Sequence, residues 1–343
     1  MELDKRDCYN LKGMAITSII IHNFCHWLPN APQENEFCWK ADNVNSFWSS
    51  FDNIDPFIAI FSFLGHYGVP IFVFITGYGL VKKYIELDGY DNIKKYVIQH
   101  YLKLTRLLLV GLVLYYIVSL LLDKDELNVI TVPLQLIYFC NIVPTKYLTI
   151  VPGPYWYFGL TMQFYILFLF VRKDMMRRCL LFLLCSITLL LVSSNHHNMT
   201  VWLKYNCFGS SIPLVLGFFY ARYNSYVTIN SRFSLIMVFV LSTILLLGLE
   251  QTYVTWMFSS IPVLLGGYSL MVLSRPISSF FEEIGKVSNY IFVIHPICRL
   301  LIFSLYDSYH LSWYICLLIY VIISVLLAMI LSRVIIKITM IVN

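Results

Sequence analysis

The chain has 343 residues, of which 59% are hydrophobic and only 13% charged, and its formal net charge is +5. Soluble domains carry about 25% charged residues, so this composition excludes an ordinary soluble domain. Continuous apolar stretches of about 18 residues or more recur along the chain, each long enough to cross roughly 30 Å of hydrocarbon as a helix. Transmembrane barrels have short alternating segments instead. The sequence therefore predicts an all-α polytopic membrane protein, a single integral-membrane domain over residues 1–343, and does not indicate nucleic-acid binding.

About ten transmembrane helices are predicted in chain order. They cover residues 11–28, 57–81, 103–122, 154–171, 178–194, 205–221, 232–249, 254–273, 286–306 and 312–336. A further apolar piece at 130–143 is shorter. Because cytoplasmic loops are rich in Lys and Arg, the basic run RKDMMRR at 172–178 should lie inside. It does so only if 130–143 is a re-entrant or interfacial segment, and both termini are then predicted to be cytoplasmic.

Three other features help to place the chain. No small-residue cleavage site follows the first apolar run, so this run is predicted to be a retained span. The nine cysteines have neither metal-ligand nor CxxC spacing. The stretch 91–106 is a basic amphipathic segment, typical of a juxtamembrane helix held by anionic lipid headgroups. Its cations could also attract a phosphorylated cytosolic ligand.

Histidines occur at comparable depth in three predicted spans. His22 lies near the middle of the first span, with His26 one helical turn further along the same face. His66 in the second span and His295 in the ninth lie at similar depth, with Arg299 one turn beyond His295. Ionisable side chains inside a membrane are costly and usually functional, so these residues predict a polar cavity. The alternative is a set of neutral buried histidines bonded to backbone carbonyls, which a proline-kinked helix provides near His295.

A metal site was the other chemistry considered for His22 and His26, because histidines at i and i+4 can ligate zinc. The chain contains no HExxH motif, and no carboxylate inside a span stands out as a third ligand. The sequence therefore predicts no metal.

Four stretches of the chain carry a family likeness. The sequence resembles the acyltransferase-3 family of integral membrane acyltransferases, which modify glycans and lipids from the extracytoplasmic side. The stretches are LKGMAITSIIIHNF (11–24), GHYGVPIFVFITGYGL (65–80), GPYWYFGLTMQFYILF (153–168) and EIGKVSNYIFVIHP (283–296). The family commonly has arginine, ten intervening residues and then histidine. Here Lys12 and His22 are separated by nine residues, so Asn23 holds the strict position, and Thr76 replaces the usual serine.

The resemblance implies transfer of an acyl group, usually acetyl, from cytosolic acyl-CoA to a hydroxyl of an extracytoplasmic glycan or lipid-linked sugar, in a bacterial inner membrane. His22, or alternatively His26, would act as general base or as an acyl relay. Cations near the inner face are candidates for binding the acyl-CoA phosphates: Lys12, Lys82, Lys83 and Arg106. Other candidates for contacts with substrate or oxyanion are Arg299, His295, Thr76 and His66. A transporter or flippase of a polar or lipid-linked solute would use the same cavity without consuming acyl-CoA.

Overall fold

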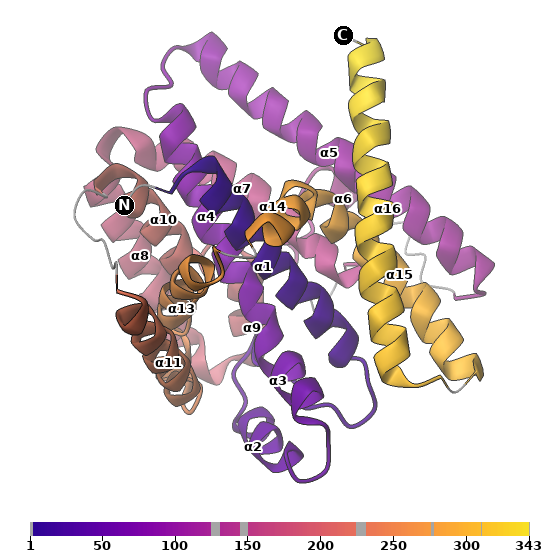
Figure 1. Ribbon diagram of the computed structural model, residues 1–343. Coiled ribbons are helices and arrows are strands. Elements are labelled where there is room, and N and C mark those ends of the chain that lie inside the picture. The colour runs from indigo at the N-terminus through magenta and orange to yellow at the C-terminus, as the bar shows by residue number, and fades with distance from the viewer. Residues whose placement is uncertain are drawn as a thin grey trace.

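The computed structural model describes residues 3–124, 131–144, 150–223, 231–275, 278–309 and 311–342, and every regular element in these ranges is a helix (Figure 1). The α-helices are α1 (Lys5–Cys25), α2 (Ala41–Ser50), α3 (Pro56–Leu64), α4 (Gly68–Tyr84), α5 (Tyr90–Leu121), α6 (Thr131–Leu136), α7 (Trp156–Val171), α8 (Met175–Val192), α9 (His197–Tyr205), α10 (Ser211–Tyr223), α11 (Arg232–Leu249), α12 (Tyr253–Trp256), α13 (Ser260–Leu273), α14 (Ser278–Lys286), α15 (Ser288–Tyr309) and α16 (Trp313–Val342). Short 3₁₀ helices lie at Gly65–Tyr67, Gly153–Tyr155, Arg172–Asp174 and Ser193–Asn195.

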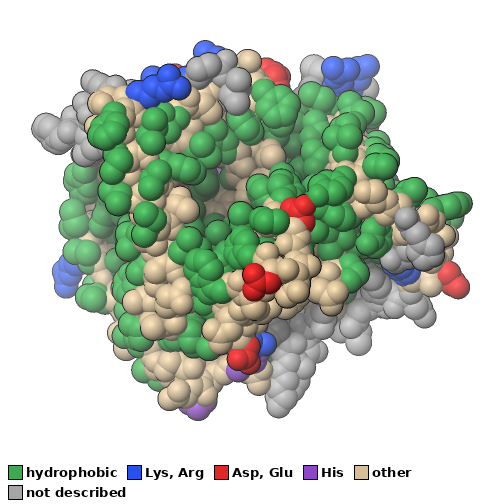
Figure 2. Space-filling model, turned by 60° about the horizontal axis from the view of Figure 1, so that its bottom comes forward, with side chains coloured by type: hydrophobic (Ala, Val, Ile, Leu, Met, Phe, Trp, Pro, Cys, Tyr) green, Lys and Arg blue, Asp and Glu red, His purple; other side chains and the backbone are tan. Residues whose placement is uncertain are grey.

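Six helical stretches in the described ranges are long and apolar enough to cross a membrane. They are Pro56–Tyr84, Tyr90–Leu121, Gly153–Asn195, Arg232–Leu249, Ser288–Tyr306 and Trp313–Ile335. Hydrophobic side chains cover most of the face shown in Figure 2, and the larger groups of Lys and Arg lie along one edge. The protein is therefore an all-helical integral membrane protein. Within the apolar piece at 130–143 the structure forms only α6, about 9 Å long and too short for a crossing.

Helix α1 lies in the middle of the molecule (Figure 1). It contacts α3, α4, α13, α14, α15 and α16 and the 3₁₀ turn at Gly65–Tyr67. Close approach to α14 depends on Gly285, where a Cβ would lie 1.9 Å from the carbonyl oxygen of Tyr9 on α1. The contact between α4 and α10 also depends on a glycine, because a Cβ on Gly217 would lie 2.3 Å from the carbonyl oxygen of Phe74. Small residues at such crossings let helix backbones pack closely in lipid.

Candidate functional site

Three of the predicted histidines form one cluster around the C-terminal end of α1. The ring centroids of His22 and His26 are 5.3 Å apart, and those of His22 and His66 are 5.7 Å apart. His66 belongs to the 3₁₀ turn that separates α3 from α4. Gly65 makes this approach possible, because a Cβ at that position would lie 2.6 Å from the Cβ of His22. The break between α3 and α4 thus presents His66 to α1.

The environment of His22 selects one tautomer of its ring. The side chain is buried, and its Nδ1 lies 3.1 Å from the carbonyl oxygen of Phe61 on α3. Because a carbonyl oxygen only accepts hydrogen bonds, Nδ1 carries the proton and donates it. The Nε2 atom of the neutral ring is then left as the basic atom. His22 is held in the orientation that a proton acceptor requires.

Glu34, in the loop after α1, completes the cluster. Its Oε2 lies 2.6 Å from Nδ1 of His26, and the exposed fractions of the two side chains are only 15% and 22%. One ring nitrogen each of His22 and His26 and a carboxylate oxygen of Glu34 all lie within 4.8 Å of one another. Burial opposes ionisation of Glu34, but the hydrogen bond and charge of His26 outweigh it and lower the pKa of Glu34 to about 2. Glu34 is therefore ionised at neutral pH.

These three side chains could together hold a metal ion, and Glu34 is the carboxylate that the sequence did not identify. Neighbouring ligand atoms in a tetrahedral zinc site with bonds of about 2.0–2.1 Å are about 3.4 Å apart. The 2.6 Å separation between Nδ1 of His26 and Oε2 of Glu34 is shorter and is that of a hydrogen bond to a carboxylate. The arrangement fits a carboxylate–histidine pair better than a pair of ligands to one ion.

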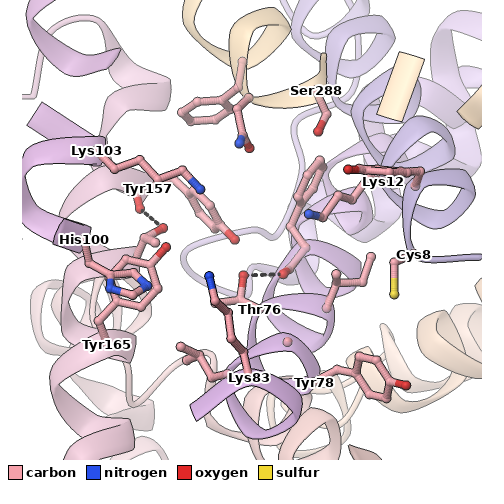
Figure 3. Close-up of a pocket in the computed structure, with 18 of the residues that line it drawn as sticks. Cys8, Lys12, Thr76, Tyr78, Lys83, His100, Lys103, Tyr157, Tyr165 and Ser288 are labelled. Atoms are coloured by element: carbon pink, nitrogen blue, oxygen red, sulfur yellow. Dashed lines mark hydrogen bonds between the residues drawn. The ribbon is translucent and has the colours of Figure 1, made fainter. Parts of the chain in front are cut away.

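On one side of the cluster is a cavity of about 740 Å³, here called the lysine cavity. Figure 3 shows the ammonium groups of Lys12, Lys83 and Lys103 pointing toward the same space, from α1, α4 and α5. Among the described residues that line it, Asp4 is the single acid, and the lysines are Lys5, Lys12, Lys82, Lys83 and Lys103. Thr76 also lines it, and its hydroxyl donates to the carbonyl oxygen of Phe72 at 2.8 Å.

Arg106 is exposed and does not line the lysine cavity, whereas Lys103 on the same helix does. The two residues are three positions apart on α5, a rotation of about 60° around the helix axis. The charge pattern of the segment was informative, but it could not tell which of its cations faces inward.

A second cavity of about 60 Å³, here called the Glu36 cavity, lies past the C-terminal end of α1, beside His66. Its lining includes Asn35, Glu36, His66, Tyr67, Lys204, Trp256 and Ser259. The Lys204 Nζ lies 4.3 Å from the centroid of the Trp256 ring. Glu250 is buried behind this lining and accepts hydrogen bonds from the hydroxyls of Tyr67 and Ser259, the latter at 2.8 Å.

The pKa values of Glu36 and Lys204, which line the Glu36 cavity, both differ from their usual values. Burial, reinforced by repulsion from Glu34, raises the pKa of Glu36 to about 8, and Lys204 only partly offsets this. Burial lowers the pKa of Lys204 to about 8, against the attraction of Glu36 and Glu250. Sequence reasoning missed Glu36, Lys204 and Glu250 as site residues, because they come from loops and short helices far apart in the chain.

The two cavities approach each other beside the histidines. Val69 lines both of them. Ile19, one turn before His22 on α1, lines the lysine cavity, and His66 lines the Glu36 cavity. Of the cluster, His66 alone lines a cavity, while His22, His26 and Glu34 line neither of the two; His22 lies one turn from Ile19 and in ring contact with His66.

His295 and Arg299 do not line either cavity. Nδ1 of His295 donates to the carbonyl oxygen of Ile291 at 3.2 Å, and its ring lies 5.8 Å from that of Phe292, which does line the lysine cavity. The guanidinium of Arg299 donates to Oδ1 of Asn23 at 2.8 Å and stacks 4.1 Å from the centroid of Trp27. Asn23, at the family's usual histidine position, therefore faces α15.

The helices long enough to cross a membrane and a half-buried carboxylate–histidine pair beside two cavities define an integral membrane protein with a candidate polar site. The acyltransferase-3 family model, described as an acyltransferase domain, matches residues 9–333. The chain therefore belongs to the acyltransferase-3 family, as its four stretches indicated. No curated protein and no solved structure matched the chain significantly.

Proposed function

We propose that this acyltransferase moves an acyl group, usually acetyl, from cytosolic acyl-CoA to a hydroxyl of an extracytoplasmic glycan or lipid-linked sugar. The observation that carries the proposal is the junction at Val69, where cavities of different chemistry approach each other beside His22 and His66. A donor in one cavity and an acceptor in the other would meet there. The host membrane in this proposal is a bacterial inner membrane.

The proposed topology has ten crossings with both termini in the cytoplasm. The Gly153–Asn195 stretch would be about 65 Å long as one helix, twice what a crossing needs, and contains the charged turn Arg172–Asp174. Counting it as two crossings and adding α1, α10 and α13 to the other spans gives ten. The lysine cavity, which includes Lys5 near the N-terminus, then opens to the cytoplasm.

The lysine cavity suits the donor. Acyl-CoA carries several phosphate charges on its nucleotide and a neutral thioester at the far end of a flexible arm. Five lysines against one acid favour binding of the phosphates. The apolar end of the cavity, at Ile19, Val69 and Phe72, is compatible with the thioester and adjoins His22.

The Glu36 cavity suits the reacting end of the acceptor. Its volume of about 60 Å³ holds a hydroxyl and its carbon but not a whole sugar ring, so the rest of the acceptor would lie outside it. Asn35, Glu36 and Lys204 offer hydrogen-bond donors and acceptors to that hydroxyl. His66 connects this lining to His22 through ring contact. An acceptor hydroxyl bound here would be directed toward the histidine cluster.

In the proposed reaction, Nε2 of His22 removes the proton from the acceptor hydroxyl while its oxygen attacks the thioester carbonyl. The carbon–sulfur bond then breaks, and the CoA thiolate takes the proton from the His22 imidazolium. The Glu34 carboxylate, within 4.8 Å of both histidines, stabilises that cation. A relay through an acyl-imidazole on His22 uses the same residues, and His26 remains the alternative acceptor of the proton.

The test is acetyl-CoA turnover by purified protein in lipid vesicles. We expect His22→Ala to lose about 10²–10⁴-fold in rate, the usual contribution of a general base. Glu34→Gln should lose less, because the base remains and only its countercharge is removed. His196→Ala, which alters an exposed histidine outside both cavities, is the control and should turn over at the wild-type rate.

If His26→Ala loses acetyl-CoA turnover while His22→Ala stays active, the general base is His26, one turn further along α1. A wild-type protein that neither binds nor consumes acyl-CoA would contradict the proposed reaction and favour a transporter.

A further inference from the structure

We propose that Tyr84, His100 and Tyr165, with Lys83 and Lys103, form a nucleotide subsite in the lysine cavity. The adenine of the donor would pack on the three rings and its phosphates would pair with the two lysines. This inference rests on the proposed use of acyl-CoA and deepens it, because it fixes the direction in which the donor lies. The thioester end then points toward Ile19 and Val69.

The three rings gather from three different helices on one wall of the cavity. The ring centroids of His100 and Tyr165 are 4.1 Å apart, and those of Tyr84 and His100 are 5.4 Å apart at an interplanar angle of 70°. All three side chains line the cavity and are only half-buried. Each can therefore offer part of its ring to a flat ligand, and stacking on an aromatic side chain is worth about 1–3 kcal/mol per base.

Polar groups beside the rings match the rest of a nucleotide. Nδ1 of His100 donates to the carbonyl oxygen of Tyr96 at 2.8 Å, so Nε2 of the neutral ring is left to accept a hydrogen bond, as from the amino group of adenine. The Lys83 Nζ lies 5.0 Å from the centroid of the Tyr84 ring. In Figure 3, Lys83 and Lys103 reach into the space beside His100 and Tyr165.

The opposite end of the lysine cavity is apolar. Ile19, Val69 and Phe72 line it without a charged group among them, and His22 is one turn beyond Ile19. From Val69 to Lys83 the chain runs about 21 Å along α4. An extended pantetheine arm bridges such a separation, whereas a compact acyl donor does not. The asymmetry between the two ends places the phosphates near Lys83 and the reacting thioester near His22.

The experiment compares acetyl-CoA with S-acetylpantetheine, a donor that keeps the thioester and arm but lacks the nucleotide. Steady-state kinetics are measured for wild type, Lys83→Ala, Lys103→Ala and Tyr165→Leu. We expect KM for acetyl-CoA to rise about tenfold in each variant, the loss of one charged or stacking interaction. The kinetic constants for S-acetylpantetheine and kcat for acetyl-CoA should stay at wild-type values.

Two further measurements separate the possible outcomes. Adenosine 3′,5′-bisphosphate should compete with acetyl-CoA in the wild type and more weakly in each variant. Lys173→Ala removes a cytoplasmic-loop lysine outside the cavity and should change neither donor's KM.

Equal effects of the variants on both donors, or no inhibition of an acetyl-CoA-consuming wild type by the bisphosphate, would overturn the subsite alone. A wild type that consumes neither donor would overturn the proposed function and the subsite with it.

Discussion

At the residue scale, the Glu36 cavity contains a carboxyl group that resists ionisation. In water Glu36 would lose its proton near pH 4.5, but burial and the nearby charge of Glu34 raise its pKa to about 8 in the folded protein. Between these values the unfolded chain binds fewer protons than the folded one. The contribution of Glu36 to folding stability therefore falls as pH rises through this window. The lowered pKa of Glu34 acts in the opposite sense, but only below pH 4.5.

We predict that Glu36→Gln removes this part of the pH dependence. Thermal unfolding is measured in detergent between pH 5 and pH 8. The unfolding temperature of the variant, relative to that of the wild type, should rise as pH rises. Glu86→Gln, at an exposed carboxyl group, is the matched control and should follow the wild type. Parallel curves for wild type and Glu36→Gln would show that Glu36 ionises as freely in the folded protein as in the unfolded chain.

The sequence reached the histidines of the site but not their partners. Helical periodicity put His22 and His26 on one face, and counting residues from the membrane edge put His66 at the same depth. Neither argument applies to Glu34, because the path of a loop is not set by a repeat. Lys204 lies on α9, far along the chain, and comes to Glu36 only through the packing of the whole bundle. Residues whose position depends on tertiary structure were the ones missed.

At the element scale, the sequence predicted where apolar helices occur but not their interruptions. The second predicted span, 57–81, is a single apolar run, yet the structure divides it into α3 and α4 with a 3₁₀ turn at Gly65–Tyr67. The hydrophobicity of a run predicts that it lies in the membrane. It does not predict where one turn of the run changes from an α-helix to a 3₁₀ helix. That turn places His66 against His22, so the irregular element is the one that brings two candidate site residues together.

The crossing of α1 and α14 gives a prediction about stability. In Gly285→Ala the new Cβ would lie 1.9 Å from the backbone oxygen of Tyr9, and a backbone atom cannot rotate away as a side chain can. We expect a loss of about 1–3 kcal/mol, as for an overpacked core, measured by thermal unfolding of the purified protein.

The matched control for Gly285→Ala is Gly248→Ala on α11, where nothing lies within 4 Å of the added Cβ. That variant should equal the wild type or exceed it by up to about 1 kcal/mol, through better helix propensity. If both variants unfold like the wild type, the two helices do not pack as closely as the structure has them.

At the scale of the whole molecule, the lysine cavity lies along α1 and the Glu36 cavity lies past its C-terminal end, and the proposed function assigns a different reactant to each. In Figure 1, α2 and α3 lie at the bottom of the view and both chain ends lie in the upper half. Lys5 lines the lysine cavity, so in the proposed function the N-terminus and the donor entrance share one side of the membrane. The positive-inside bias predicts that this side is the cytoplasm.

Sidedness is therefore testable in vesicles that contain the protein in both orientations. A protease-cleavable tag at the N-terminus reports the fraction of molecules whose N-terminus faces outward. We expect acyl-CoA added outside to be consumed in proportion to the cleaved fraction, because the highly charged donor cannot cross lipid to reach the other molecules. Permeabilising the vesicles should raise the rate to that of the whole population. A rate that follows the uncleaved fraction instead would place the donor entrance at the Glu36 cavity and reverse the proposed direction of transfer.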